Sequence, residues 1–179
     1  MIVIEKLMEW LSYRQRFFLG FLGCVAMELS AVYFQFVVGL EPCPLCITQR
    51  MIIFVAAVVF LVAAIHNPER SGIRVYSGLG LLVTIFGFGV ASYHFVIQLL
   101  PSNELASCGP GASYILKHMD LAHAIRMFLT GTGDCRQIVW SLFGLSMPFW
   151  VALCYAGLIA LCVIQLVSTR RVKIEVRSR

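Results

Sequence analysis

The chain has 179 residues, of which 60% are hydrophobic and 13% are charged, and its formal net charge is +5. A soluble domain averages about half apolar and roughly a quarter charged residues, so this composition indicates a membrane protein. Most basic residues flank apolar stretches, and no basic stripe with interleaved aromatic residues is present. We therefore expect no nucleic-acid partner, and we interpret the positive charges as topology signals.

Four stretches are candidates for membrane-spanning helices, because a spanning helix needs about 20 mostly apolar residues. They are residues 17–40, 47–65, 75–100 and 149–167. The first is not expected to be a cleaved signal peptide, since its apolar run is long and Glu28 interrupts it. The prediction is an all-α integral membrane protein in which residues 1–179 form a single four-helix bundle.

The distribution of basic residues predicts the orientation in the membrane. Ten Lys and Arg residues fall in segments 1–16, 66–74 and 168–179, and four fall on the opposite side. Basic residues favour the cytoplasmic side, so both termini are predicted to be cytoplasmic. The loops at 41–46 and 101–148 would face the periplasm of a multi-pass protein in a bacterial inner membrane, where disulfides persist.

A C-x-x-C motif, Cys43 to Cys46, lies where the second span begins. Pro42 and Pro44 prevent an earlier helix start, so Cys46 is expected in or near the first turn. The helix dipole and Arg50, one turn deeper, would favour a thiolate there, unless Arg50 merely snorkels to the interface. A structural bridge would close too small a loop to stabilise much. No second ligand pair at zinc spacing is present, so no metal is expected.

Two further cysteines, Cys108 and Cys135, lie in the long outward loop, each beside glycine. Spacing leaves two interpretations open: a bridge that closes the loop, or an exchangeable disulfide that another thiol can attack. The remaining cysteines lie inside apolar spans, where a thiol behaves as a small hydrophobic group. These are Cys24, Cys154 and Cys162.

Two outward cysteine pairs suggest a relay, and a relay needs an electron acceptor, because disulfide exchange moves oxidation without creating it. No haem, flavin or iron–sulfur signature is present, so a lipid-soluble quinone is the expected acceptor. Cys46 and Arg50 lie where its headgroup would sit. His94 is either a packing histidine or a proton donor and quinone contact. Glu28 is expected to make a structural hydrogen bond.

Several motifs together resemble the DsbB family of bacterial inner-membrane disulfide oxidoreductases. The resemblance covers nearly the whole chain and includes "MELSAVYFQ", "PCPLC" with "ITQR", "SYHFVIQLLPS", "GDC" and "WSLFGLSMPFW". It implies that a reduced DsbA-like thioredoxin-fold protein attacks Cys108, that Cys135 then attacks Cys43, and that Cys46 faces ubiquinone or menaquinone with assistance from Arg50. The sequence between the loop cysteines departs most from the family pattern. The partner could therefore also be a dedicated substrate, as in the DsbI branch of the family.

The favoured interpretation is a quinone-dependent protein-disulfide oxidoreductase that draws on the membrane quinone pool. A vitamin K epoxide reductase-like enzyme would carry its quinone-proximal C-x-x-C late in the chain. A transporter would need more polar residues along its spans. A non-enzymatic scaffold with two structural disulfides is the remaining alternative, and its bridges would resist exchange with a reduced thioredoxin-fold protein.

Overall fold

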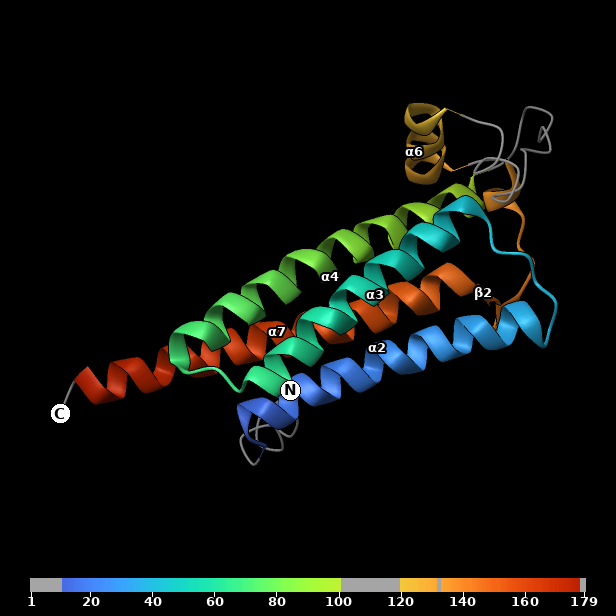
Figure 1. The fold of residues 1–179 in the computed structure, drawn as a ribbon. Coiled ribbons are helices and arrows are strands. Elements are labelled where there is room, and N and C mark those ends of the chain that lie inside the picture. The colour runs from blue at the N-terminus through green and yellow to red at the C-terminus, as the bar shows by residue number, and fades with distance from the viewer. Residues whose placement is uncertain (1–10, 101–119, 132, 178–179) are drawn as a thin grey trace.

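The computed structural model describes residues 11–100, 120–131 and 133–177. Its framework is four long helices that run side by side (Figure 1). All four are long and apolar enough to cross a membrane, which confirms the predicted fold class. The helices are α2 (Tyr13–Phe36), α3 (Pro44–His66), α4 (Arg70–Leu99) and α7 (Met147–Arg177), with the candidate span of α7 ending at Thr169.

The helix ends differ from the predicted spans by a few residues, because capping decides them. α2 begins at Tyr13 instead of residue 17, since the Ser12 side chain accepts a hydrogen bond from the Gln15 backbone in a capping box. It ends at Phe36, four residues before the predicted end. α3 begins at Pro44, which occupies the first helical position, where the missing N–H of proline costs nothing.

The predicted outward loop 101–148 contains regular structure of its own. Its described part includes α6 (Leu121–Thr130), the short 3₁₀ helix η1 (Gly133–Arg136) and an antiparallel hairpin of β1 (Ser141–Leu142) and β2 (Leu145–Ser146). The hairpin is a small exception to the all-α prediction. α7 begins directly after β2, two residues before the predicted start of the fourth span.

The core of the bundle is built on small residues of α4 that let neighbouring helices approach. A Cβ atom added to Gly87 would collide with the ring of Tyr155 on α7. One added to Gly80 would lie 3.0 Å from the Phe60 ring and 3.2 Å from the Cys162 sulfur. These small residues of α4 therefore serve helix packing.

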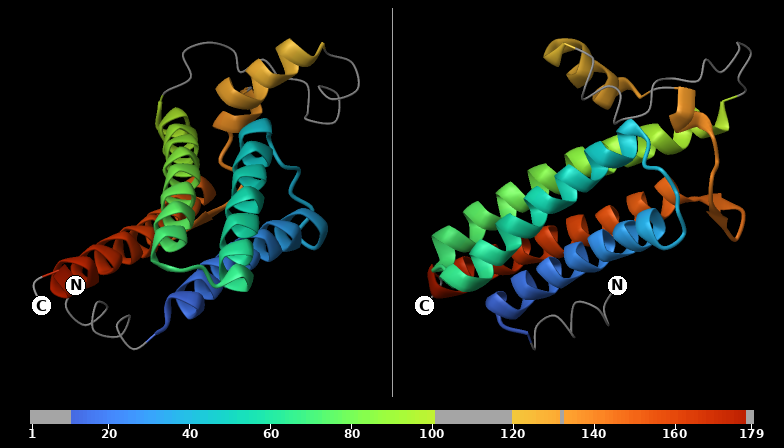
Figure 2. Two further views of the ribbon diagram at one scale, coloured as in Figure 1. Left: turned by 60° about the vertical axis from the view of Figure 1, so that its left-hand side comes forward. Right: turned by 45° about the vertical axis from the view of Figure 1, so that its right-hand side comes forward.

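The elements divide between two ends of the bundle (Figure 2). One end holds the start of α2, the turn between α3 and α4, and the end of α7. The opposite end holds the start of α3, together with α6 and η1, both of which contact α3. The fold thus places α6 and η1 of the predicted outward loop beside the N-terminus of α3.

Candidate redox site

The dithiol lies at the N-terminus of α3. Cys43 is the N-cap residue, and its sulfur accepts a hydrogen bond from the backbone N–H of Cys46 over 3.3 Å. The two Sγ atoms are 2.8 Å apart, with the Cys43 thiol donating to Cys46. Cys46 is therefore in the first turn, as predicted, where the positive end of the helix dipole favours a thiolate.

Cys135, from η1, is the third sulfur of the site. Its side chain is only 1% exposed and packs with Leu45 and Ile97 beside Cys43. A hydrogen bond with Cys135, joined by one with Cys46, raises the pKa of Cys43 well above the usual value for a thiol. The Cys43 thiol therefore keeps its proton in the reduced site. Cys108 lies outside the described residues, so its pairing with Cys135 stays a prediction.

Gly131 allows the η1 segment to approach α3 this closely. Its φ of +80° and ψ of 169° belong to a region of backbone conformation that is essentially restricted to glycine. A Cβ atom at this position would also lie 2.8 Å from a methyl carbon of Leu45 and 3.4 Å from the Cys135 sulfur. A side chain here would therefore strain the backbone that leads into Cys135 and would displace the Leu45 side chain packed beside it.

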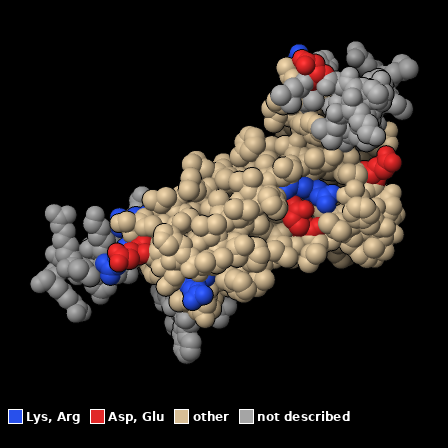
Figure 3. Space-filling view, in the orientation of Figure 1, with Lys and Arg blue, Asp and Glu red and all other residues tan. Residues whose placement is uncertain are grey.

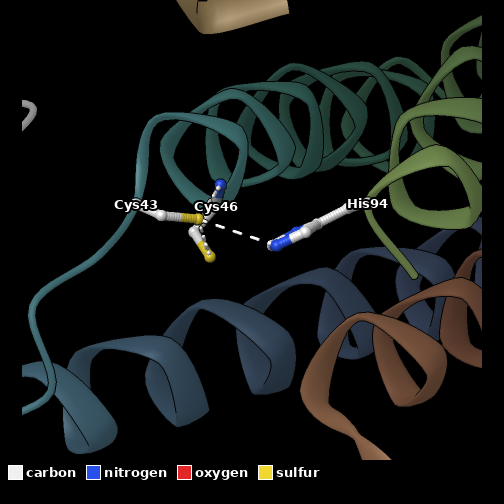
Figure 4. A group of neighbouring side chains, drawn as sticks. All are labelled: Cys43, Cys46 and His94. Carbon is white, nitrogen blue, oxygen red and sulfur yellow. Dashed lines mark hydrogen bonds between the residues drawn. The ribbon is translucent and has the colours of Figure 1, made fainter. Parts of the chain in front are cut away.

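His94, on α4, faces the same thiols (Figure 4). Only 2% of the residue is exposed. Its Nε2 lies 3.8 Å from Cys43 Sγ and 3.0 Å from the backbone oxygen of Cys135, and its Nδ1 lies 3.1 Å from Nε2 of Gln49. A carbonyl oxygen only accepts, so His94 Nε2 carries the proton when it binds Cys135, and Nδ1 accepts from the Gln49 amide.

Arg50 lies on another side of α3 and reaches α2. Its guanidinium donates a 2.6 Å hydrogen bond to Gln35 and pairs with Glu28, with 3.5 Å between Nε and Oε2. Glu28 therefore neutralises the charge of Arg50, whereas the sequence led us to expect only a structural hydrogen bond for it. A basic group adjoins an acidic group within the otherwise uncharged flank of the bundle (Figure 3).

Three residues of the site escaped the analysis of the sequence. Gln49 orients His94, Gln35 binds Arg50, and Tyr155 donates a 2.9 Å hydrogen bond to the Gln49 backbone oxygen. The available signal was their polarity inside apolar spans, because a polar group at membrane depth needs a partner. The cysteines of the spans match expectation in part: Cys24 and Cys162 are buried in the core, whereas Cys154 is exposed on α7.

Fold and site together define a four-helix membrane thiol–disulfide exchange protein. The family profile described as "Disulfide bond formation protein DsbB" matches residues 13–165. The chain therefore belongs to the DsbB family, whose members are quinone-dependent disulfide oxidoreductases of the inner membrane.

Relatives named "Disulfide bond formation protein B" align with most of the chain. The one from Methylococcus capsulatus is 47% identical over 154 residues, which cover 86% of this chain and 94% of the relative. The one from Nitrosococcus oceani is 44% identical over 153 residues, which cover 84% of this chain and 90% of the relative. The one from Saccharophagus degradans is 42% identical over 160 residues, which cover 89% of this chain and 96% of the relative.

Proposed function

We propose that this protein reoxidises a DsbA-like thioredoxin-fold protein at the periplasmic face of the inner membrane, with both termini in the cytoplasm. Electrons would pass from the partner through Cys108 and Cys135 to Cys43 and Cys46, and then to ubiquinone or menaquinone. The observation that supports this best is the contact of Cys135 with Cys43. That contact joins two cysteines 92 positions apart, one on each proposed pair.

The proposed exchange conserves atoms and electrons. A partner thiolate attacks Cys108, which breaks the Cys108–Cys135 bond and leaves Cys135 as a thiolate. Cys135 attacks Cys43, which forms a new disulfide and releases Cys46. The second partner thiol then resolves the mixed disulfide, Cys108 recovers its bond to Cys135, and Cys43 is released. The partner has lost two electrons and two protons, and the Cys43–Cys46 pair has gained them.

The local structure supports distinct roles for the two cysteines of the motif. The Cys43 thiol keeps its proton, as its raised pKa indicates, and it faces Cys135. Cys46 occupies the helical turn where the dipole favours negative charge, with Arg50 one turn deeper. We therefore propose Cys43 as the sulfur attacked by Cys135 and Cys46 as the sulfur that faces the acceptor.

The residues around Arg50 fit a quinone headgroup. The side chains of Arg50 and Glu28 are 23% and 26% exposed, so the pair is accessible from the bundle surface. Glu28 Oε1 is buried and has no hydrogen-bond partner among the described residues. Arg50 would donate to a quinone oxygen and Glu28 would accept from a quinol hydroxyl. The bound quinone supplies a two-electron, two-proton acceptor.

His94 fits a role in proton transfer at the dithiol. Its Nε2 faces the Cys43 sulfur, and its other nitrogen is held by Gln49. Oxidation of the dithiol releases protons that quinone reduction consumes. We propose that His94 takes up the Cys43 proton at Nε2 in the tautomer that carries its own proton on Nδ1, which the Gln49 amide accommodates when its oxygen faces the ring. This assigns His94 to the quinone reaction through Cys43.

An anaerobic single-turnover experiment tests the proposed function. Purified protein with bound quinone is mixed with one equivalent of a reduced DsbA-like protein, and quinone absorbance is followed beside partner oxidation. We expect the loss of one quinone for every two partner thiols oxidised, no quinone loss in Cys46→Ser, and unchanged behaviour in Cys154→Ser. Intact quinone with both disulfides unreacted in the wild-type protein would instead favour the structural scaffold.

A further inference from the structure

A third potential metal ligand lies beside the reduced dithiol, although spacing along the chain does not show it. Cys43 Sγ, Cys46 Sγ and a ring nitrogen of His94 all lie within 4.8 Å of one another. Figure 4 shows the imidazole directed from α4 toward the two cysteines at the start of α3. We propose that these three residues form a binding site for a thiophilic divalent cation, with zinc as the natural candidate, when the dithiol is reduced.

The distances suit a tetrahedral ion. Zinc–sulfur and zinc–nitrogen bonds of about 2.3 and 2.0 Å put neighbouring ligand atoms roughly 3.5–3.8 Å apart. Cys43 Sγ is already 3.8 Å from His94 Nε2. The two sulfurs, now 2.8 Å apart, would separate by about 1 Å as the ion displaces the thiol hydrogen between them.

The surroundings of His94 match those of metal-bound histidines, in which the second ring nitrogen is held by a hydrogen bond. Gln49 holds Nδ1 and is itself buried. Binding through Nε2 requires the proton on Nδ1, which the Gln49 amide accommodates when its oxygen faces the ring. The Cys135 carbonyl, which loses His94 as a donor, keeps a 3.3 Å hydrogen bond from Gln98.

The chemical balance makes the site dependent on redox state. Two thiols and a divalent cation give a bis-thiolate complex and release two protons, whereas a disulfide between the cysteines offers no thiolate. Two cysteines and one histidine leave a fourth position for water or for the Cys135 thiol beside Cys43. A bound ion would occupy both sulfurs and stop the dithiol from being oxidised until a chelator removes it.

Cobalt(II) is the probe for this site, because its absorbance reports thiolate ligation and tetrahedral geometry. The full-length protein, in detergent, freed of quinone and reduced without oxygen, is titrated with cobalt(II) and then with zinc. We expect one cobalt per chain with thiolate charge-transfer bands, displacement by zinc, and no bands in the oxidised protein. The oxidised chain is the control that keeps the fold and removes the ligands.

Variants assign the ligands. Cys43→Ser and Cys46→Ser should abolish the bands, His94→Gln should weaken binding while keeping a polar group in the buried position, and Gln49→Leu should lower zinc affinity about 10–100-fold. Cys154→Ser should bind as the wild type does. Absent bands in the reduced wild type, or bands of full strength in Cys46→Ser or His94→Gln, would overturn the proposal. The titration uses neither quinone nor partner, so its failure would leave the proposed electron relay untouched.

Discussion

Gln49 and Arg50 are neighbours on α3, yet their side chains enter different environments. Gln49 is 4% exposed and binds His94 on α4 beside the thiols, in a buried network without charge. Arg50 turns to α2, where its contacts with Glu28 and Gln35 remain partly open to the surroundings. Two consecutive residues, about 100° apart around the helix axis, therefore lie on a side that is closed and neutral and on a side that is accessible and charged.

The energetics of the two sides differ for the same reason. A buried polar group that loses its partner costs about 1–3 kcal/mol. A partly exposed ion pair contributes at most about 1 kcal/mol where water reaches and screens it. The closed side should therefore govern stability and the position of the sulfurs, whereas the open side should govern reaction with an accepting molecule. Four substitutions test this division.

Arg50→Leu should have the largest effect, and it should fall on function. Loss of a charged hydrogen-bond donor to the quinone costs about 1.5–3 kcal/mol, which lowers kcat/KM for quinone about 10–100-fold. Steady-state quinone reduction at varied quinone concentration measures this. Arg50→Lys keeps the charge but lacks the planar guanidinium, so its kcat/KM should fall between those of the wild type and Arg50→Leu. An unchanged kcat/KM in Arg50→Leu would remove Arg50 from the quinone site.

Gly131→Ala should act on the contact between Cys135 and the dithiol. The backbone conformation of Gly131 costs alanine about 1–3 kcal/mol, and the added methyl group meets Leu45. Partner-driven quinone reduction should slow, while direct reduction of the Cys43–Cys46 pair by a small dithiol should be unaffected. Gly157→Ala is the matched control, since nothing lies within 4 Å of its added Cβ. Equal rates in both variants would contradict the role of Gly131.

Gln49→Leu should act mainly on stability. It leaves Nδ1 of the buried His94 without its partner, so the free energy of unfolding should fall by about 1–3 kcal/mol. Denaturant unfolding in detergent, followed by tryptophan fluorescence, measures the loss. Gln49→Glu, whose carboxylate can accept a hydrogen bond once the ring proton moves to Nδ1, should recover part of it. Full stability in Gln49→Leu would show that the hydrogen bond contributes nothing.

Glu28→Gln should have the smallest effect on stability, at most about 1 kcal/mol, because the pair with Arg50 is partly exposed. Gln35 still holds the guanidinium, so Arg50 should keep its position. The same unfolding measurement serves here. If Glu28→Gln lost more free energy of unfolding than Gln49→Leu, the charged side of α3, and not the closed side, would govern stability.

Local features of the chain determined most of the fold. Hydropathy identified the four spans, since each must shield its own backbone from lipid within one continuous helix. Proline chemistry placed Cys46 in the first turn of α3. The helix ends were less accurate, because polar caps such as Ser12 lie outside any apolar window.

Only the tertiary structure decided how the site converges. His94 meets Cys43 across 51 positions, and Tyr155 meets Gln49 across 106. These contacts depend on which helices adjoin and how each is rotated, and both follow from side-chain packing between segments far apart in the chain. From the sequence alone we therefore expected no metal, because it shows one C-x-x-C pair and no second ligand pair at zinc spacing. The proposed third ligand, His94, comes from another helix, and it meets the cysteines only when α3 and α4 are packed together.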